Sequence, residues 1–306
     1  LAEEQLYAKS AILIEATTGE VIFEKNADEQ MYPASTTKVL TTLLGILNGD
    51  MNATVTMDSI AANIPSDSST IPLSIGETIN FQDLLYATMV RSGNEGANLI
   101  AETVSGSIGA FVDLMNQTAH FANANGLHDD AHYTTARDMA KISRKAMENE
   151  TFRNIVKTYS YKLPKSNLQR SRVLIGNSDN WLNSGSENEY FYALATGIKT
   201  GYHARAGYCY IGSAEKEGVS LISVVFYTSK SGRWLDSKKL MEYGFSQFVS
   251  VTPQDLYEMN PTVIETTGYS MEDDDIGRLK LAIQPTTSTR TVNIVATKAE
   301  VESLAR

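Results

Sequence analysis

The sequence is poor in the residues that build disulfides and metal centres. Its 306 residues hold one cysteine and four histidines. A single cysteine excludes an intrachain disulfide and a thiolate metal cluster, and the apolar neighbours of Cys209 indicate a buried, unreactive side chain. The histidines show no metal-ligand spacing, and the acidic run 272–275 lacks the pattern of a calcium loop. We therefore expect no metal and no other cofactor.

An excess of basic charge is also missing, as are long hydrophobic runs. Lysine and arginine number 26 against 36 acidic residues, which gives a net charge of -10. This balance argues against nucleic acid as a partner, because binding it requires a basic stripe. No apolar run reaches 18 residues, so no membrane-spanning helix is predicted. No signal peptide is recognisable, and we expect a trimmed product of an exported precursor, whose membrane association would need a segment absent from this sequence.

Three short motifs stand in order along the chain: S-T-T-K at residues 35–38, S-G-N at 92–94 and K-T-G at 199–201. Each alone is common by chance. Together they supply the parts of a serine acyl-transfer site in which lysine replaces histidine as the base. Ser35 offers a hydroxyl nucleophile, and Lys38 lies one helical turn later on the same face.

The other motif residues complete this chemistry. Ser92 is predicted to relay a proton, Asn94 to hold a substrate amide, and Lys199 to place positive charge beside a developing oxyanion. Lys199 is also the second cation which, together with burial, would lower the pKa of the Lys38 amine toward neutrality, as a base requires.

The ordered set resembles the penicillin-recognising serine enzymes, whose pattern is S-x-x-K, S-x-N and K-T-G. Longer strings narrow the resemblance to the low-molecular-weight D-alanyl-D-alanine carboxypeptidases, and the likeness covers roughly residues 8 to 248. These strings are E-K-N-A-D at 24–28, P-A-S-T-T-K at 33–38, H-Y-T-T-A-R-D-M-A at 132–140 and G-I-K-T-G-Y at 197–202.

The resemblance also assigns a substrate-binding set. It implies an oxyanion hole made by the backbone N–H groups of Ser35 and Tyr202, and a site for the terminal carboxylate of the substrate at Thr200 and Arg233. A guanidinium suits a carboxylate in geometry and charge, although a helix-surface arginine is an equal interpretation of Arg233. Gly201 would let the substrate backbone approach closely.

The activity implied by the resemblance is that of a serine-type D-Ala-D-Ala carboxypeptidase. Such an enzyme removes the terminal D-alanine from peptidoglycan stem pentapeptides through an acyl-enzyme, here on Ser35, and is acylated by β-lactam antibiotics. The stem peptide and β-lactams are thus the expected partners. An extracytoplasmic, wall-facing location follows from the substrate.

Two alternatives remain. A class A β-lactamase shares the three motifs but deacylates with a glutamate in an E-x-x-L-N loop. The nearest string, D-N-W-L-N at 179–183, begins with aspartate and stands too near the K-T-G motif, so it is interpreted as a structural segment. The second alternative is a catalytically silent cell-wall-binding domain, against which the intact motif residues argue.

Some positions depart from the family pattern. Thr196 stands where aspartate is common, Asn125 where histidine is usual, and His203 where threonine or serine follows the K-T-G-Tyr string. His203 is expected either to add pH dependence or to point to solvent. Arg137 and Asp138 match a family pair near the site, for which a structural salt bridge is the favoured interpretation.

The predicted fold is α/β (α+β), with strands at both ends of a helical middle forming one sheet. By resemblance this is a β-lactamase/transpeptidase-like domain, an antiparallel sheet flanked by helices, over residues 1–250. Residues 251–306 are expected to form a small β-rich C-terminal domain that is short or truncated. Strands are predicted at 10–15, 20–25, 208–214 and 219–228, with short ones at 263–267, 279–283 and 291–295. Helices are predicted after Ser35 and at 81–90, 94–104, 110–125, 139–148 and 232–248.

Overall fold

The computed structural model describes residues 1–116, 120–174, 177–259, 263–265, 278–280 and 294–304. The chain divides into two compact units. The larger comprises Leu1–Glu215 with Ser220–Gly244, and the smaller comprises Lys216–Val219 with Phe245–Arg306. The acidic run 272–275 lies outside the described residues. None of the described helices has the length and apolar character needed to span a bilayer.

The larger unit is built on one five-stranded sheet with the order β2-β1-β9-β8-β7. The chain's two ends meet in it, because β1 pairs antiparallel with β9, for example through Ala11 and Val225. This confirms the predicted single sheet formed by both ends of the chain. The strands are β1 (Ser10–Glu15), β2 (Val21–Lys25), β7 (Ala195–His203), β8 (Gly207–Lys216) and β9 (Val219–Thr228).

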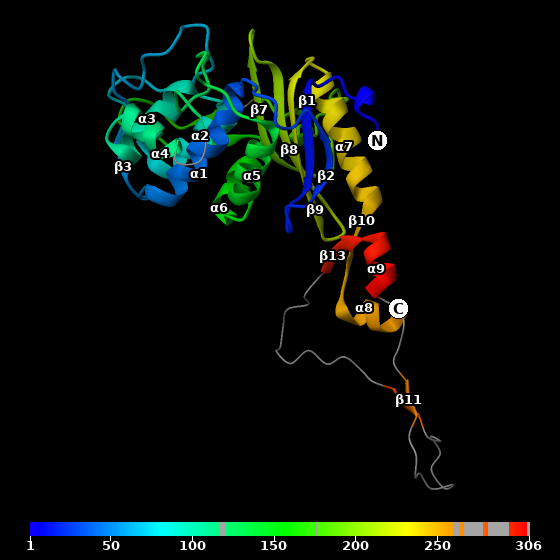
Figure 1. The fold of residues 1–306 in the computed structure, drawn as a ribbon. Helices are drawn as coiled ribbons and strands as arrows, with labels where there is room; N and C mark the ends of the chain where they lie inside the picture. The colour runs from blue at the N-terminus through cyan, green and yellow to red at the C-terminus, as the bar shows by residue number, and fades with distance from the viewer. Residues whose placement is uncertain (117–119, 175–176, 260–262, 266–277, 281–293, 305–306) are drawn as a thin grey trace. The chain divides into compact units, whose positions relative to one another are not determined.

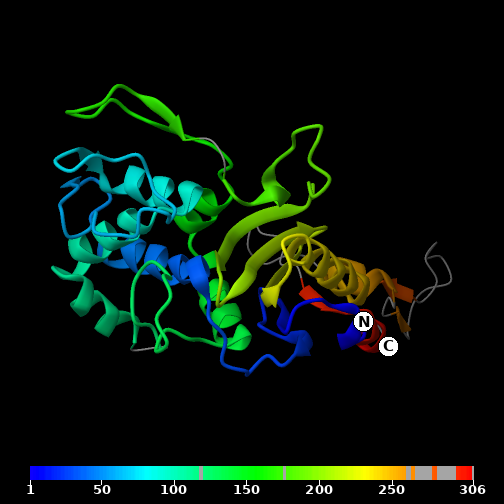
Figure 2. The same ribbon diagram turned by 90° about the horizontal axis from the view of Figure 1, so that it is seen from above.

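Helices cover both faces of this sheet (Figures 1 and 2). The helical middle lies on one face, and α7 packs on the other, where a Cβ added at Gly244 would meet the side chain of Leu221 at 2.6 Å. Every residue of β1 is buried, as expected for a strand covered on both faces. The helices are α1 (Lys38–Asn48), α2 (Phe81–Arg91), α3 (Asn94–Ser105), α4 (Ile108–Met115), α5 (Ala136–Met147), α6 (Glu150–Val156) and α7 (Gly232–Gln247).

The helix predicted at 110–125 is wrong over residues 120–125, whereas residues 117–119 lie outside the described residues. α4 ends at Met115, and the next side chain, Asn116, exchanges hydrogen bonds with the backbone of Phe121. Further on, the Asn123 side chain accepts a hydrogen bond from the Gly126 N–H, and Gly126 has a φ of 86°. Asparagine side chains that bond the local backbone, followed by a left-handed glycine, favour a turn over a continued helix.

The smaller unit holds strands and helices. β10 (Phe248–Val251) pairs with β13 (Ile294–Thr297), and β11 (Val263–Glu265) pairs with β12 (Arg278–Lys280). Val251, Ala296 and Val301 form its small core. The helices α8 (Pro253–Met259) and α9 (Lys298–Leu304) were not expected from the strand pattern. The remaining residues of the predicted strands, 266–267, 281–283 and 291–293, lie outside the described residues.

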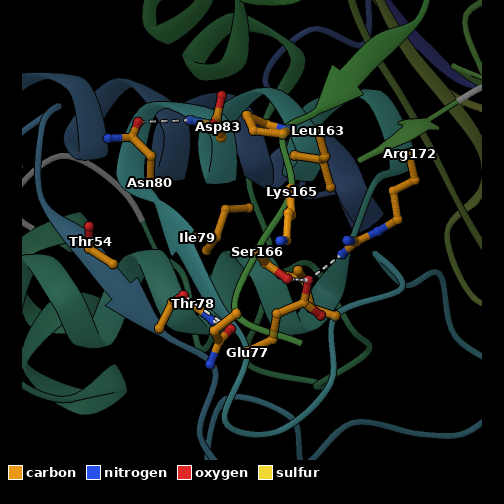
Figure 3. A pocket seen from close by; sticks show the side chains of 13 residues that line it. Thr54, Glu77, Thr78, Ile79, Asn80, Asp83, Leu163, Lys165, Ser166 and Arg172 are labelled. Carbon is orange, nitrogen blue, oxygen red and sulfur yellow. Dashed lines mark hydrogen bonds and ion pairs between the residues drawn. The ribbon is translucent and has the colours of Figure 1, made fainter. Parts of the chain in front are cut away.

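A buried carboxylate fastens two short hairpins of the larger unit. These hairpins are β3 (Thr54–Thr56) with β4 (Thr78–Asn80), and β5 (Tyr161–Leu163) with β6 (Arg172–Leu174). Glu77 accepts hydrogen bonds from the Ser74 N–H, Ser166 and Gln169, and it pairs with Arg172 at 2.8 Å. Figure 3 shows Glu77 with Ser166 and Arg172 on the wall of a pocket of about 300 Å³.

Replacing Glu77 with alanine is expected to lower the free energy of unfolding by about 2–4 kcal/mol, because Arg172 and several donors lose their buried acceptor. Burial opposes the charge of Glu77, but the Ser74 N–H, the Ser166 hydroxyl and Arg172 hold its pKa below the ordinary value. Such a group contributes stability above its unfolded pKa and loses it as pH falls through the folded pKa. Urea unfolding from pH 7 to pH 3 measures both effects.

The control is Glu29→Ala, which removes an exposed ion pair with Lys9 and should cost less than about 1 kcal/mol. Equal losses in the two variants, or a Glu77→Ala deficit that persists unchanged in acid, would contradict this account.

Candidate active site

Ser35 lies in a tight 3-10 turn, η2 (Ala34–Thr37), directly before α1. The helix therefore begins at Lys38, slightly later than a helix starting at the serine itself. Ala34 has a φ of 48°, a strained value for a non-glycine residue. Two glycines pack against this turn. A Cβ at Gly126 would lie 2.0 Å from the Ala34 carbonyl oxygen, and one at Gly201 would lie 3.1 Å from the Ser35 nitrogen.

The Lys38 amine is fully buried and has three hydrogen-bond partners. Its Nζ lies 3.0 Å from Ser35 Oγ, 2.7 Å from Asn94 Oδ1 and 2.5 Å from the carbonyl oxygen of Asn125. The two amide oxygens can only accept a hydrogen bond, whereas the serine hydroxyl can also donate one. A neutral Lys38 therefore keeps two N–H bonds to the amide oxygens and turns its lone pair toward the Ser35 hydroxyl.

The surroundings favour that neutral form. Burial is the main cause that holds the pKa of Lys38 well below its ordinary value, and the positive charge of Lys199 lowers it further. A nearby carboxylate, Glu95, acts in the opposite direction. The effects of burial and of Lys199 agree with the expectation from the sequence, whereas the effect of Glu95 was not expected.

Lys199 is the second buried lysine, on β7. Its Nζ donates to Ser92 Oγ at 3.0 Å and to the Thr200 carbonyl oxygen at 2.9 Å. Burial lowers the pKa of Lys199 to about 7, with Asp179 opposing and Arg233 reinforcing the shift. Ser92 therefore contacts Lys199 in this structure. Its predicted proton relay from Lys38 stays a prediction.

An open cleft of about 370 Å³ lies above these lysines. Ser35, Gly201 and Tyr202 line it, whereas Lys38, Asn94 and Lys199 are buried. The structure thus brings the predicted nucleophile, the predicted base, the second lysine and the substrate-binding residues to one place. The cleft is also lined by Ser69, Thr70, Arg91, Ser92, Ser178, Thr200, Tyr208 and Arg233.

Arg233, at the start of α7, reaches into this cleft over aromatic rings. Its guanidinium carbon lies 5.0 Å from the centre of the Tyr208 ring and 4.5 Å from that of Trp234. Among the residues that the structure describes, it forms no ion pair, and its Nε is buried without a hydrogen-bond partner. Thr200 shares a short hydrogen bond with Ser178. Ser178 was missed because serine has no motif there.

The departures from the family pattern have different surroundings. Asn125 is buried and supplies the carbonyl oxygen that binds Lys38, and its side chain donates to Asn98. Thr196 bonds Ser213 at 2.6 Å. His203 packs against the ring of His128 at 5.2 Å, and burial together with His128 lowers its pKa. His203 therefore does not simply point to solvent.

Arg137 forms structural salt bridges, as favoured from the sequence, although its partner is not the adjacent Asp138. Arg137 pairs with Glu24 at 2.6 Å and with Asp28 at 2.7 Å, carboxylates of the strand-and-turn segment around β2. Asp138 instead bonds Thr135 at the N-cap of α5. Successive helical residues point in different directions, so a neighbouring pair of opposite charge need not meet.

The D-N-W-L-N segment is structural. Asp179 is buried, and the single O–H of Tyr210 donates to its carboxylate, lying 3.0 Å from each of the two oxygens, so its side chain faces the core. Cys209 is also buried, and burial raises the pKa of its thiol to about 12, as expected for an inert side chain. Within the described ranges, no group of three or more potential ligands could hold a metal ion.

Comparison with known proteins agrees with this site. The family model described as D-alanyl-D-alanine carboxypeptidase matches residues 1–230. The chain is 32% identical over 268 residues to the D-alanyl-D-alanine carboxypeptidase DacF of Bacillus subtilis, covering 84% of this chain and 66% of DacF. It is 33% identical over 270 residues to DacA of Escherichia coli, covering 81% of this chain and 63% of DacA. The chain therefore spans slightly less than two thirds of these relatives.

A solved structure extends the likeness to the fold. The Streptomyces K15 DD-transpeptidase matches with a TM-score of 0.72 at 28% identity, over 80% of this chain and all of the transpeptidase. The curated enzyme from the same source, a D-alanyl-D-alanine carboxypeptidase, is 33% identical over 251 residues, 75% of this chain and 84% of that protein. The chain thus belongs to the D-alanyl-D-alanine carboxypeptidase family.

Proposed function

We propose that this protein is a serine-type D-Ala-D-Ala carboxypeptidase that trims peptidoglycan stem pentapeptides. The observation that carries the proposal is the environment of Lys38. A buried amine with a lowered pKa lies 3.0 Å from the hydroxyl of Ser35, and its other two partners accept hydrogen bonds only. This arrangement suits a general base acting on a serine nucleophile.

The reaction has two steps. Lys38 takes the proton of the Ser35 hydroxyl as the oxygen attacks the carbonyl carbon between the two terminal D-alanines. The C–N bond then breaks, the proton held by Lys38 passes through Ser92, which Lys199 contacts, to the leaving amine, and D-alanine departs. In the second step the neutral Lys38 takes a proton from water as the water oxygen attacks the ester on Ser35, and it returns that proton to the Ser35 oxygen as the tetrapeptide leaves. The backbone N–H groups of Ser35 and Tyr202 are the proposed donors to the oxyanion.

The position of β7 supports binding of an extended peptide. β7 is the last strand in the sheet order, and within the described structure its second edge has no strand partner. An extended substrate can pair with such an edge through backbone hydrogen bonds. Gly201, on this strand, keeps β7 close to the turn of Ser35.

The carboxylate of the substrate is assigned to Arg233 and Thr200. Arg233→Ala is expected to lower kcat/KM for a peptide ending in a free D-Ala carboxylate by about 10–100-fold, since a charge-assisted hydrogen bond is worth roughly 1.5–3 kcal/mol. The ratio of rates between this peptide and its C-terminal amide should fall toward one. Steady-state kinetics on both substrates measures it.

The matched control is Arg205→Ala, which removes an exposed arginine outside the lining of the cleft and should leave the ratio unchanged. If Arg233→Ala lowers kcat/KM equally for the peptide acid and its C-terminal amide, Arg233 does not recognise the carboxylate.

β-Lactams are proposed as a second class of ligand, because their strained amide mimics the D-Ala-D-Ala carbonyl. Ser35 would open the ring and retain the acyl group. The wall substrate and the membership of the family together support an extracytoplasmic location for the protein.

The deciding experiment is the release of free D-alanine from diacetyl-Lys-D-Ala-D-Ala, followed together with intact-mass analysis after penicillin treatment. We expect D-alanine release and a long-lived penicilloyl adduct. Rapid penicillin turnover would instead indicate a β-lactamase. If neither D-alanine release nor a penicilloyl adduct is observed, the protein is a catalytically silent wall-binding domain. Adding an amine acceptor tests for transfer in place of hydrolysis, the activity named for the Streptomyces K15 structure.

A further inference from the structure

Glu95 is a buried carboxylate that the proposed mechanism does not use. It follows Asn94 in the first turn of α3 and is 4% exposed. One oxygen, Oε1, accepts a hydrogen bond from the Ile71 N–H at 2.5 Å. The other, Oε2, is buried and makes no hydrogen bond of good geometry among the described residues, although the backbone N–H groups of Glu95 and Gly96 also act on the carboxylate. A buried carboxylate that is only half satisfied is costly, so its presence beside the motif residue Asn94 calls for a physical reason.

The segment that Glu95 holds forms a wall of the cleft. Ser69 and Thr70 line the cleft, and the Ser69 carbonyl oxygen accepts a hydrogen bond from the Asn94 N–H at 2.9 Å. Ile71, which follows Thr70, packs against Gly93 and Gly96, the glycines on either side of Asn94 and Glu95. A Cβ at Gly93 would lie 2.4 Å from the Ile71 side chain, and one at Gly96 would lie 2.5 Å from it. Residues 92–96 thus hold residues 69–71 in place through packing and backbone hydrogen bonds.

Glu95 also lies next to the base in the fold, because it directly follows Asn94, whose side-chain oxygen accepts a hydrogen bond from the Lys38 amine at 2.7 Å. Its charge raises the pKa of Lys38, and burial, partly offset by backbone N–H groups and by Lys38, raises the pKa of Glu95 itself to about 7. Two further titratable groups face Lys38. Lys199, which lies on β7, lowers the pKa of Lys38. The ring of His132 is hydrogen-bonded to Thr37 at 2.8 Å. Burial is the main cause that lowers the pKa of His132 to about 4, so His132 is neutral at pH 6–8.

We propose that Glu95 is a positioning residue for acylation, which fixes the 69–71 wall through the Ile71 N–H and sets the protonation of Lys38 through its buried charge. The inference rests on the proposed acylation of Ser35. It gives Glu95 a double role, since one oxygen orders the substrate cleft while the carboxylate charge opposes the loss of the lysine proton.

Two substitutions separate these roles. Glu95→Gln keeps an oxygen acceptor for Ile71 but removes the charge, so KM should change little. The acid limb of the pH profile for penicillin acylation should move to lower pH by about half a unit or more, because a base without a nearby anion loses its proton more readily. Glu95→Ala also removes the acceptor, and we expect KM for the peptide to rise by roughly fivefold or more.

The matched control is Glu102→Gln, which neutralises another carboxylate on the same helix. Burial and Asp58 raise the pKa of Glu102, and no contact joins it to residues 69–71 or to Lys38 among the interactions described. Its pH profile should equal that of the parent. An unshifted acid limb in Glu95→Gln, or an equal shift in Glu102→Gln, would overturn the inference. If the parent protein forms no penicilloyl adduct, the proposed function itself fails.

Discussion

Ser35→Ala is expected to abolish the penicilloyl adduct and to reduce D-alanine release by about 10⁴-fold or more, the scale seen when a serine nucleophile is removed. The reason is chemical, because Ser35 supplies the only hydroxyl in contact with the Lys38 amine among the described residues. Without it no acyl-enzyme forms, and the cleft can only bind substrate. Intact-mass analysis after incubation with penicillin, with peptide mapping of the parent adduct, measures the effect.

The change should leave the fold intact. Among the described residues the Ser35 side chain has a hydrogen bond with Lys38 and with no other group. The turn is held by Thr36 and Thr37, whose hydroxyls donate to the carbonyl oxygens of Pro33 and Ala34. Ser69→Ala is the matched control, because Ser69 lines the same cleft but has no hydrogen bond to a lysine. It should retain the adduct. An adduct that survives in Ser35→Ala would place the nucleophile elsewhere.

Much of the site could be predicted from sequence because its side chains lie in short motifs whose chemistry indicates their roles. These motifs are a serine one turn from a lysine, an S-x-N string and a K-T-G string, and the fold brings them together at one cleft. The carbonyl oxygen of Asn125 could not be predicted, since any residue carries one. Its place near Lys38 depends on the turn that Gly126 makes against Ala34, which is a long-range packing event.

The misplaced elements have the same origin. The apolar periodicity before residue 116 favours a helix that continues past Met115, whereas the hydrogen bonds between Asn116 and Phe121 favour a turn. Arg137 and Asp138 are adjacent in sequence and opposite in charge. Even so, Arg137 pairs with Glu24 on β2, 113 residues earlier in the chain. Glu95 was overlooked because a carboxylate after the S-x-N motif has no distinctive pattern.

Lys38→Met is expected to lower the acylation rate by about 10²–10⁴-fold, the usual contribution of a positioned base. Methionine has nearly the same length, so the cavity stays filled, but it has no lone pair of matching basicity for the Ser35 proton. The change also removes the N–H donors from Asn94 and Asn125, which costs roughly 1–3 kcal/mol for each buried acceptor left unpaired. Stopped-flow acylation by a chromogenic β-lactam measures the rate, and thermal unfolding measures the stability.

A chemical rescue separates the lost base from any lost stability. Cys209 is the only cysteine in the chain, so a Cys209→Ala background allows Lys38→Cys to be alkylated selectively in denaturant with 2-bromoethylamine and then refolded. The resulting thioether amine restores a group of nearly the same length as lysine but lower basicity. Acylation should return in part, and its acid limb should lie at lower pH than in the parent, as expected when the base itself has the lower pKa. Refolded protein that stays inactive with the amine restored would show that Lys38 does more than accept the Ser35 proton.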